Sequence, residues 1–74
     1  MTYLEYLRRQ QGLTLIELGK RVLYSDARLS ILENHRPPLD QVHPRLKRAL
    51  EIYFNESFDR LMSDADAILR RGAA

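Results

Sequence analysis

The sequence predicts an all-α fold, a compact bundle of five helices, and three observations support this. Apolar residues recur three and four positions apart along most of the 74-residue chain, a spacing that places them on one face of a helix. Signals for helix starts precede these runs, and glycine or proline follows several of them. No segment alternates apolar and polar residues as a half-buried β-strand would. A chain of this length forms one domain around one core.

The first two predicted helices begin with the same N-terminal signal. Thr2 and Glu5 have the spacing of a capping box, in which the hydroxyl and the carboxylate each accept a hydrogen bond from a backbone amide. Thr14 and Glu17 repeat this spacing. The helices expected from these signals cover residues 3–11 and 15–22.

Two glycines mark special positions in this region. Gly12 follows the first apolar run and can adopt the left-handed conformation that ends a helix. Gly19 lies inside the second predicted helix, where glycine costs roughly 0.5 to 1 kcal/mol relative to alanine. Its presence predicts that the backbone of a neighbouring helix passes too closely for a larger side chain.

The third predicted helix covers residues 26–33 and follows a short connection, residues 23–25. Ser25 can cap its N-terminus, and the apolar spacing places Leu29 and Leu32 in the core. Two prolines then end the helix and lead into an extended loop through residue 42.

The fourth helix is expected over residues 44–54, because proline is favoured at the first helical position. A further apolar stripe continues at helical spacing up to Gly72 and predicts one long fifth helix. The stripe consists of Phe58, Leu61, Met62, Ala65, Ile68 and Leu69. It is larger than a core of this size easily encloses, so we expect it to form a homodimer interface. Folding back onto its own chain is the alternative.

The charge is distributed unevenly along the chain. Residues 1–48 contain nine Lys and Arg against five Asp and Glu, whereas residues 49–74 contain three against five. A basic first part suits a polyanionic partner, although exposed charge is also ordinary on a soluble domain.

Several classes of function lack a sequence signal. The chain has no cysteine, and His35 and His43 lack the spacing of metal ligands, so no metal site is expected. No catalytic motif or phosphate-binding glycine loop is present, and we expect neither an enzyme, nor a cofactor, nor a small-molecule substrate. No apolar run has the length of a membrane span or the pattern of a signal peptide, which predicts a cytoplasmic location without membrane contact.

The segment from residue 12 to residue 38 reads GLTLIELGKRVLYSDARLSILENHRPP. It resembles, without a gap, the helix-turn-helix segment of the Cro and phage-repressor family of DNA-binding domains. Identical or similar residues include Gly12, Leu13, Thr14, Glu17, Leu18, Arg21, Ser25, Ser30 and Glu33. The resemblance implies a helix-turn-helix domain over residues 1–62, with the motif itself at about residues 14–34. Residues 63–74 form a C-terminal helical extension, a candidate dimerisation segment.

The resemblance implies a transcriptional regulator of the repressor type that binds double-stranded DNA as a homodimer. In this family the second helix of the motif reads the major groove. The positions that read bases fall on Asp26, Ala27, Arg28 and Ile31. The positions that contact phosphates fall on Thr14, Leu15, Ser25, Asn34 and Arg36. Arg28 is the strongest candidate, because an arginine can donate two hydrogen bonds to guanine; the alternative is an ordinary exposed arginine.

Three positions differ from the usual residues of the family. Leu15 stands where glutamine is common, and Asp26 stands where glutamine or arginine is common. Leu23 replaces the glycine of the turn, a change that disfavours its left-handed geometry. These differences support a second hypothesis, a protein-interaction module of the same fold that binds a polymerase, a repressor or a toxin. Leu15, Leu23, Tyr24 and the C-terminal stripe would then contact that partner.

Overall fold

Helices make up most of the structure, a computed structural model that describes residues 1–35 and 41–72. The described residues contain six helices and no strand apart from one isolated antiparallel bridge. The helices are α1 (Tyr3–Gln10), α2 (Leu15–Val22), α3 (Asp26–His35), α4 (Pro44–Phe54), α5 (Phe58–Leu61) and α6 (Ala65–Gly72). The prediction of an all-α fold is therefore confirmed, whereas the expected number of five helices is wrong.

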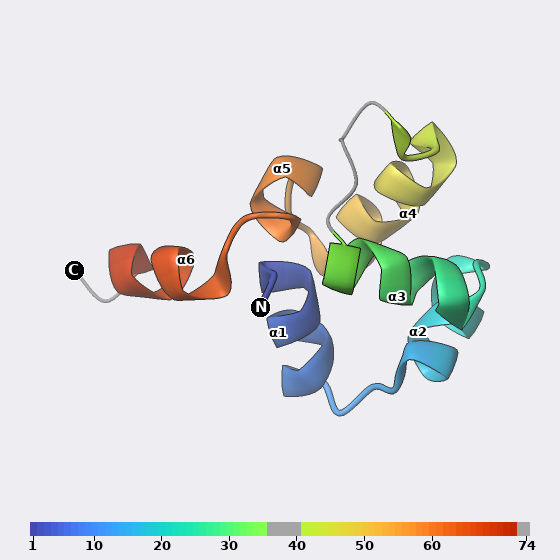
Figure 1. Ribbon diagram of the computed structural model, residues 1–74, viewed down its shortest axis with the longest axis horizontal. Helices are drawn as coiled ribbons and strands as arrows, with labels where there is room; N and C mark the ends of the chain where they lie inside the picture. The colour runs from blue at the N-terminus through green and yellow to red at the C-terminus, as the bar shows by residue number, and fades with distance from the viewer. Residues whose placement is uncertain (36–40, 73–74) are drawn as a thin grey trace.

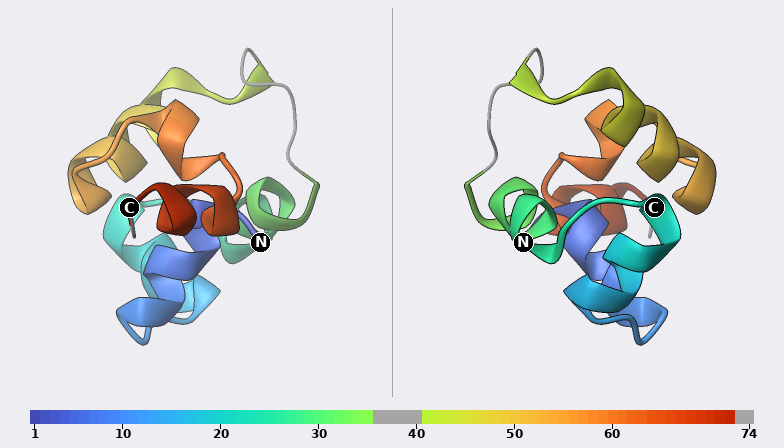
Figure 2. Two further views of the ribbon diagram at one scale, coloured as in Figure 1. Left: turned by 90° about the vertical axis from the view of Figure 1, so that its left-hand side faces the viewer. Right: turned by 90° about the vertical axis from the view of Figure 1, so that its right-hand side faces the viewer.

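The helices surround one core, with α2 packed against α3 and α4, and α1 packed against α5 and α6. Figure 1 shows α6 at the opposite end of the molecule from the turn between α2 and α3. Figure 2 shows α4 and α5 lying above α1 and α2 in two side views. The fully buried leucines of this core are Leu4, Leu18, Leu29, Leu50 and Leu61. None of the helices in the described ranges is both long enough and apolar enough to cross a membrane.

The N-terminal caps of the first two helices follow the predicted pattern, one of them only in part. The Thr14 hydroxyl accepts from the Glu17 amide, and the Glu17 carboxylate accepts from the Thr14 amide, both at 3.1 Å. The Thr2 hydroxyl likewise accepts from the Glu5 amide. The Glu5 carboxylate, however, forms an ion pair with Arg9 at 3.0 Å. The capping box of α2 is complete, and that of α1 is half formed.

The turn between α2 and α3 has left-handed geometry despite its leucine. Leu23 adopts φ 63° and ψ 42°, and its side chain is 85% exposed. The Gly19 carbonyl accepts from the amides of both Leu23 and Tyr24. A Cβ on Gly19 would overlap the Tyr24 carbonyl oxygen. Gly19 therefore makes room for backbone as predicted, but for the backbone of the turn instead of that of a helix. The turn therefore keeps its left-handed geometry, although a leucine disfavours it.

The predicted long fifth helix is interrupted at residues 62–64, which separates α5 from α6. The interruption comes from pairing with the start of the chain. The Tyr3 amide donates to the Ser63 carbonyl at 2.9 Å, and the Ala65 amide donates to the Met1 carbonyl at 3.0 Å. The Asp64 carboxylate then accepts from the Ala67 amide in the first turn of α6. Backbone groups that would continue α5 are thus used by residues from the other end of the sequence.

The apolar stripe that was expected to form a dimer interface is largely inside the molecule. Phe58, Leu61, Ala65 and Ile68 are buried within the single chain, because α5 and α6 both fold against α1. Only Met62, half-buried, and Leu69, exposed, keep accessible surface. Four of the six residues predicted for the dimer interface therefore have little surface left for a second copy, and the dimer itself stays a prediction.

The remaining helix predictions are close to the structure. α3 extends two residues beyond the predicted residue 33, and α4 has the predicted bounds. His43 is the N-cap of α4, where its Nδ1 accepts from the Arg45 amide at 3.1 Å. Most of the extended loop predicted after α3, together with Arg36, lies outside the described residues.

Candidate nucleic-acid interface

α3 has one face in the core and one face toward solvent. Leu29 and Leu32 are buried as predicted. The predicted base-reading residues lie on the other side of the helix, and all are exposed: Asp26, Ala27, Arg28 and Ile31. The periodicity of a helix produces this division, because residues three and four apart share a face. All four predicted residues are thus accessible. Arg28 and Ile31 face the start of α4, whereas Asp26 faces α2.

The N-terminus of α3 is held by the turn that precedes it. The Ser25 hydroxyl accepts from the Arg28 amide at 3.3 Å, and the Leu29 amide donates to the Ser25 carbonyl at 3.2 Å. The close approach of Gly19 to Tyr24 fixes the distance between this turn and α2. The first turn of α3 therefore has a defined position relative to α2.

The C-terminal half of α3 is held by a buried ion pair. Arg8 of α1 donates from Nε to Glu33 Oε2 at 2.8 Å and from Nη2 to Glu33 Oε1 at 3.0 Å. Its Nη1 donates to the Leu13 carbonyl at 2.7 Å. The side chains of Arg8 and Glu33 are 11% and 2% exposed. Hydrogen bonding to the Glu33 carboxylate raises the pKa of Arg8. Because Arg8 is largely buried and the hydrogen bonds of its side chain go to Glu33 and Leu13, it serves the fold and is not available to a polyanion.

The start of α4 lies beside the exposed face of α3. A depression of about 190 Å³ lies between them, and its lining is Arg28, Ile31, Leu32, Gln41, Val42, His43 and Leu46. Its floor is apolar, whereas Arg28, Gln41 and His43 provide polar groups. Sequence reasoning did not single out Gln41 or His43 for this surface. The His-Pro signal of a helix start was visible, but its proximity to α3 depends on the tertiary fold.

The residues predicted to contact phosphates occupy different environments. Thr14 and Ser25 are exposed at the starts of α2 and α3, where their hydroxyl oxygens already act as caps. Asn34 is exposed and donates to the Ser30 hydroxyl at 3.0 Å. Leu15 is half-buried against the core, so its side chain belongs to the packing. Arg36 lies outside the described residues.

Several cations remain exposed near α3. No carboxylate in residues 1–35 and 41–72 forms an ion pair with Arg28, Lys20 or Arg45. Arg21 lies 6.0 Å from the centroid of the Tyr53 ring. Asp26 is the exposed acid at the start of α3, where a carboxylate is favourable at the positive end of the helix dipole. Among the described residues, this surface thus carries exposed cations, with Asp26 at its edge.

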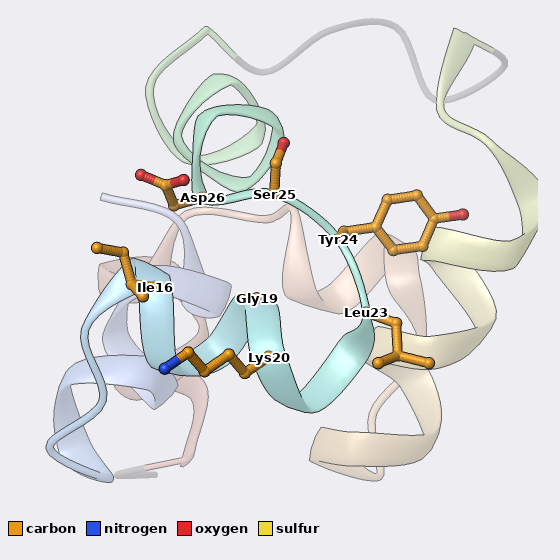
Figure 3. A pocket seen from close by; sticks show the side chains of 7 residues that line it. All are labelled: Ile16, Gly19, Lys20, Leu23, Tyr24, Ser25 and Asp26. Atoms are coloured by element: carbon orange, nitrogen blue, oxygen red, sulfur yellow. The ribbon is translucent and has the colours of Figure 1, made fainter.

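A second accessible surface lies on the outer side of α2 and is shown in Figure 3. It is a shallow, open depression of about 450 Å³ lined by Ile16, Gly19, Lys20, Leu23, Tyr24, Ser25 and Asp26. Ile16 is 58% exposed, and Leu23 is more exposed still. Tyr24 points away from Ile16 and toward α4, and it packs partly against the core. Of the residues proposed for a protein partner, Leu23 is thus accessible, whereas Leu15 and Tyr24 are half-buried.

Comparisons of the chain with protein-family models, with curated proteins and with solved structures find no match.

Proposed function

We propose that this protein is a sequence-specific regulator that binds double-stranded DNA by inserting α3 into the major groove. The observation that carries the proposal is the exposed face of α3, where Arg28 and Ile31 border the same depression. The capped turn supports one end of this helix and the buried Arg8–Glu33 pair supports the other. Because the face is already ordered, binding costs little additional conformational entropy.

The exposed side chains have chemistry that suits base edges. The Arg28 guanidinium can donate two parallel hydrogen bonds to the O6 and N7 atoms of guanine. The Asp26 carboxylate can accept from the N4 amino group of cytosine. The backbone amides at the starts of α2 and α3 can donate to phosphates whatever the side chain is. They can therefore replace the polar contact that the Leu15 side chain cannot make.

The homodimer stays part of this proposal, although most of the predicted stripe is buried. One chain presents one α3, which is enough for a half-site only. Two copies on a palindromic operator, with half-sites about one helical turn apart, would multiply a modest single-site affinity. Of the predicted stripe, Met62 and Leu69 remain accessible for this contact.

The experiment that tests the proposal is selection of bound duplexes from a random pool at two salt concentrations. The proposal predicts an enriched palindromic consensus containing guanine, and an affinity that falls steeply with salt as counterions are released from phosphates. The Arg28→Ala variant should lose or relax the preference at that guanine. Arg70→Ala is the matched control, because Arg70 is also exposed but belongs to α6. The control should select the consensus of the wild-type protein.

One observation favours the second candidate function, a protein-interaction module. Ile16 and Leu23 are exposed on the outer side of α2, in a depression that includes Asp26 but neither Arg28 nor Ile31. This hypothesis predicts that no duplex is enriched at either salt concentration. It also predicts that Leu23→Asp abolishes capture of the partner protein, whereas Arg28→Ala leaves capture unchanged.

A further inference from the structure

A large apolar side chain stands in the middle of the polar face of α3. Ile31 is 48% exposed and lies between the polar residues Arg28 and Asn34, one helical turn away on either side. The core already uses Leu29 and Leu32 from the same helix. Core packing therefore does not explain an isoleucine at this position, because a polar residue there would expose less apolar surface.

Ile31 and Arg28 border the same apolar depression. Leu32, Val42 and Leu46, all buried, provide its floor. Residues three apart in a helix are separated by about 4.5 Å along its axis. Neighbouring base pairs are about 3.4 Å apart along each strand. A helix that places Arg28 on one base pair therefore places Ile31 near the next base pair.

We infer that Ile31 reads the 5-methyl group of a pyrimidine next to the guanine that Arg28 contacts. This inference rests on the proposed function, because it requires α3 to lie in the major groove. The thymine methyl is the apolar group that the major groove presents, and apolar side chains are its usual partners. The same methyl occurs on 5-methylcytosine. The protein therefore distinguishes methylated from unmethylated cytosine at that position.

The test uses the full chain and the duplex obtained by selection. Each thymine of that duplex is replaced in turn by deoxyuridine, which removes only the 5-methyl group and keeps every hydrogen-bonding group. Binding of the wild-type protein should weaken about three- to fivefold at one thymine per half-site, the loss expected from one methyl group that is no longer buried. That thymine should neighbour the guanine whose recognition depends on Arg28.

The Ile31→Ala variant shows whether Ile31 is responsible. This variant should bind the thymine and deoxyuridine duplexes equally, and Ile31→Val should retain part of the discrimination. Ile52→Ala is the matched control, since Ile52 is an isoleucine of α4 that is 69% exposed. Circular dichroism checks that each variant is folded, which is expected because both positions are exposed. A duplex with 5-methylcytosine at the same position should bind more tightly than one with cytosine.

The possible results separate this inference from the proposed function. Loss of affinity with deoxyuridine that disappears in Ile31→Ala supports the inference. The protein could instead show steep salt dependence and a clear consensus, with an affinity that no deoxyuridine replacement changes. That result would overturn the inference and leave DNA binding intact. Equal sensitivity in the wild-type protein and Ile31→Ala would assign the methyl contact to another residue. Enrichment of no duplex would overturn both proposals.

Discussion

The buried carboxylate of Glu33 makes α1 and α3 depend on each other. Truncation of its partner leaves this charge without compensation, so Arg8→Ala should lower the free energy of unfolding by about 3 to 5 kcal/mol. Urea denaturation measures the change. Arg9→Ala is the control, because Arg9 is 62% exposed where it pairs with Glu5, and it should cost less than about 1 kcal/mol. Equal effects of the two variants would show that the Arg8–Glu33 pair does not stabilise the fold.

The substitution Gly19→Ala tests the close approach between α2 and the turn. Helix propensity alone predicts that Gly19→Ala stabilises the protein by about 0.5 to 1 kcal/mol. A Cβ at this position would overlap the Tyr24 carbonyl oxygen, so we expect destabilisation by about 1 to 3 kcal/mol instead. Thermal denaturation decides the sign. Lys20→Ala, at an exposed neighbouring position, should change the stability little, and a stabilised Gly19→Ala would contradict the described turn.

The turn between α2 and α3 contains conformational strain that a glycine would relieve. A non-glycine residue in the left-handed region costs roughly 1 to 2 kcal/mol. Glycine removes this cost, but the greater freedom of glycine in the unfolded chain offsets part of the gain. Leu23→Gly should therefore raise the free energy of unfolding by about 0.5 to 1 kcal/mol, because the exposed side chain contributes little packing. Leu23→Ala keeps a Cβ and should be nearly neutral. A destabilised Leu23→Gly, in chemical denaturation, would argue against the left-handed conformation.

The capping box of α2 makes part of the stability depend on pH. Hydrogen bonding to the Thr14 amide lowers the pKa of Glu17 below its ordinary value of 4.5. A lowered pKa stabilises the folded state above the unfolded value, and this contribution is lost as the pH falls through the folded value. The Glu17→Gln variant keeps a side-chain acceptor but does not titrate. Unfolding measured from pH 7 to pH 3 should show that the wild-type protein loses stability relative to Glu17→Gln. A constant difference between them would contradict this cap.

Local signals predicted the helices well where the determining contacts were local. Capping residues and proline defined α2 and α4, because the hydrogen bonds involved join residues two or three apart. The interruption between α5 and α6 was missed, because it depends on pairing of Thr2 with Asp64 from the other end of the chain. Apolar periodicity continues through that break and contains no information about it.

The same limit applies to the candidate interface. The exposure of Arg28 and Ile31 follows from helical periodicity and could be predicted. The position of His43 beside them depends on how α4 packs against α2. Burial of the C-terminal stripe likewise depends on the return of α5 and α6 to α1. For this reason the sequence pattern alone could not distinguish a dimer interface from a monomer core.

The arrangement of the whole molecule separates its proposed working surface from its C-terminal end. α3 and its turn lie at one end, and α6 lies at the other, packed against α1 (Figure 1). Arg28 belongs to the first end, and Arg70 and Arg71 belong to the second. If net charge alone attracted DNA, exposed arginines at both ends would contribute similarly to affinity.

Equilibrium binding to a selected duplex tests most directly whether α3 reads DNA. Wild-type protein, Arg28→Ala and Arg70→Ala are titrated against the duplex and against a copy in which the contacted guanine is replaced. We predict that the replacement costs the wild-type protein and Arg70→Ala about 1 to 3 kcal/mol of binding free energy, and that it costs Arg28→Ala almost nothing. Equal binding of the wild-type protein to both duplexes, or no salt-dependent binding to either, would contradict DNA reading by α3.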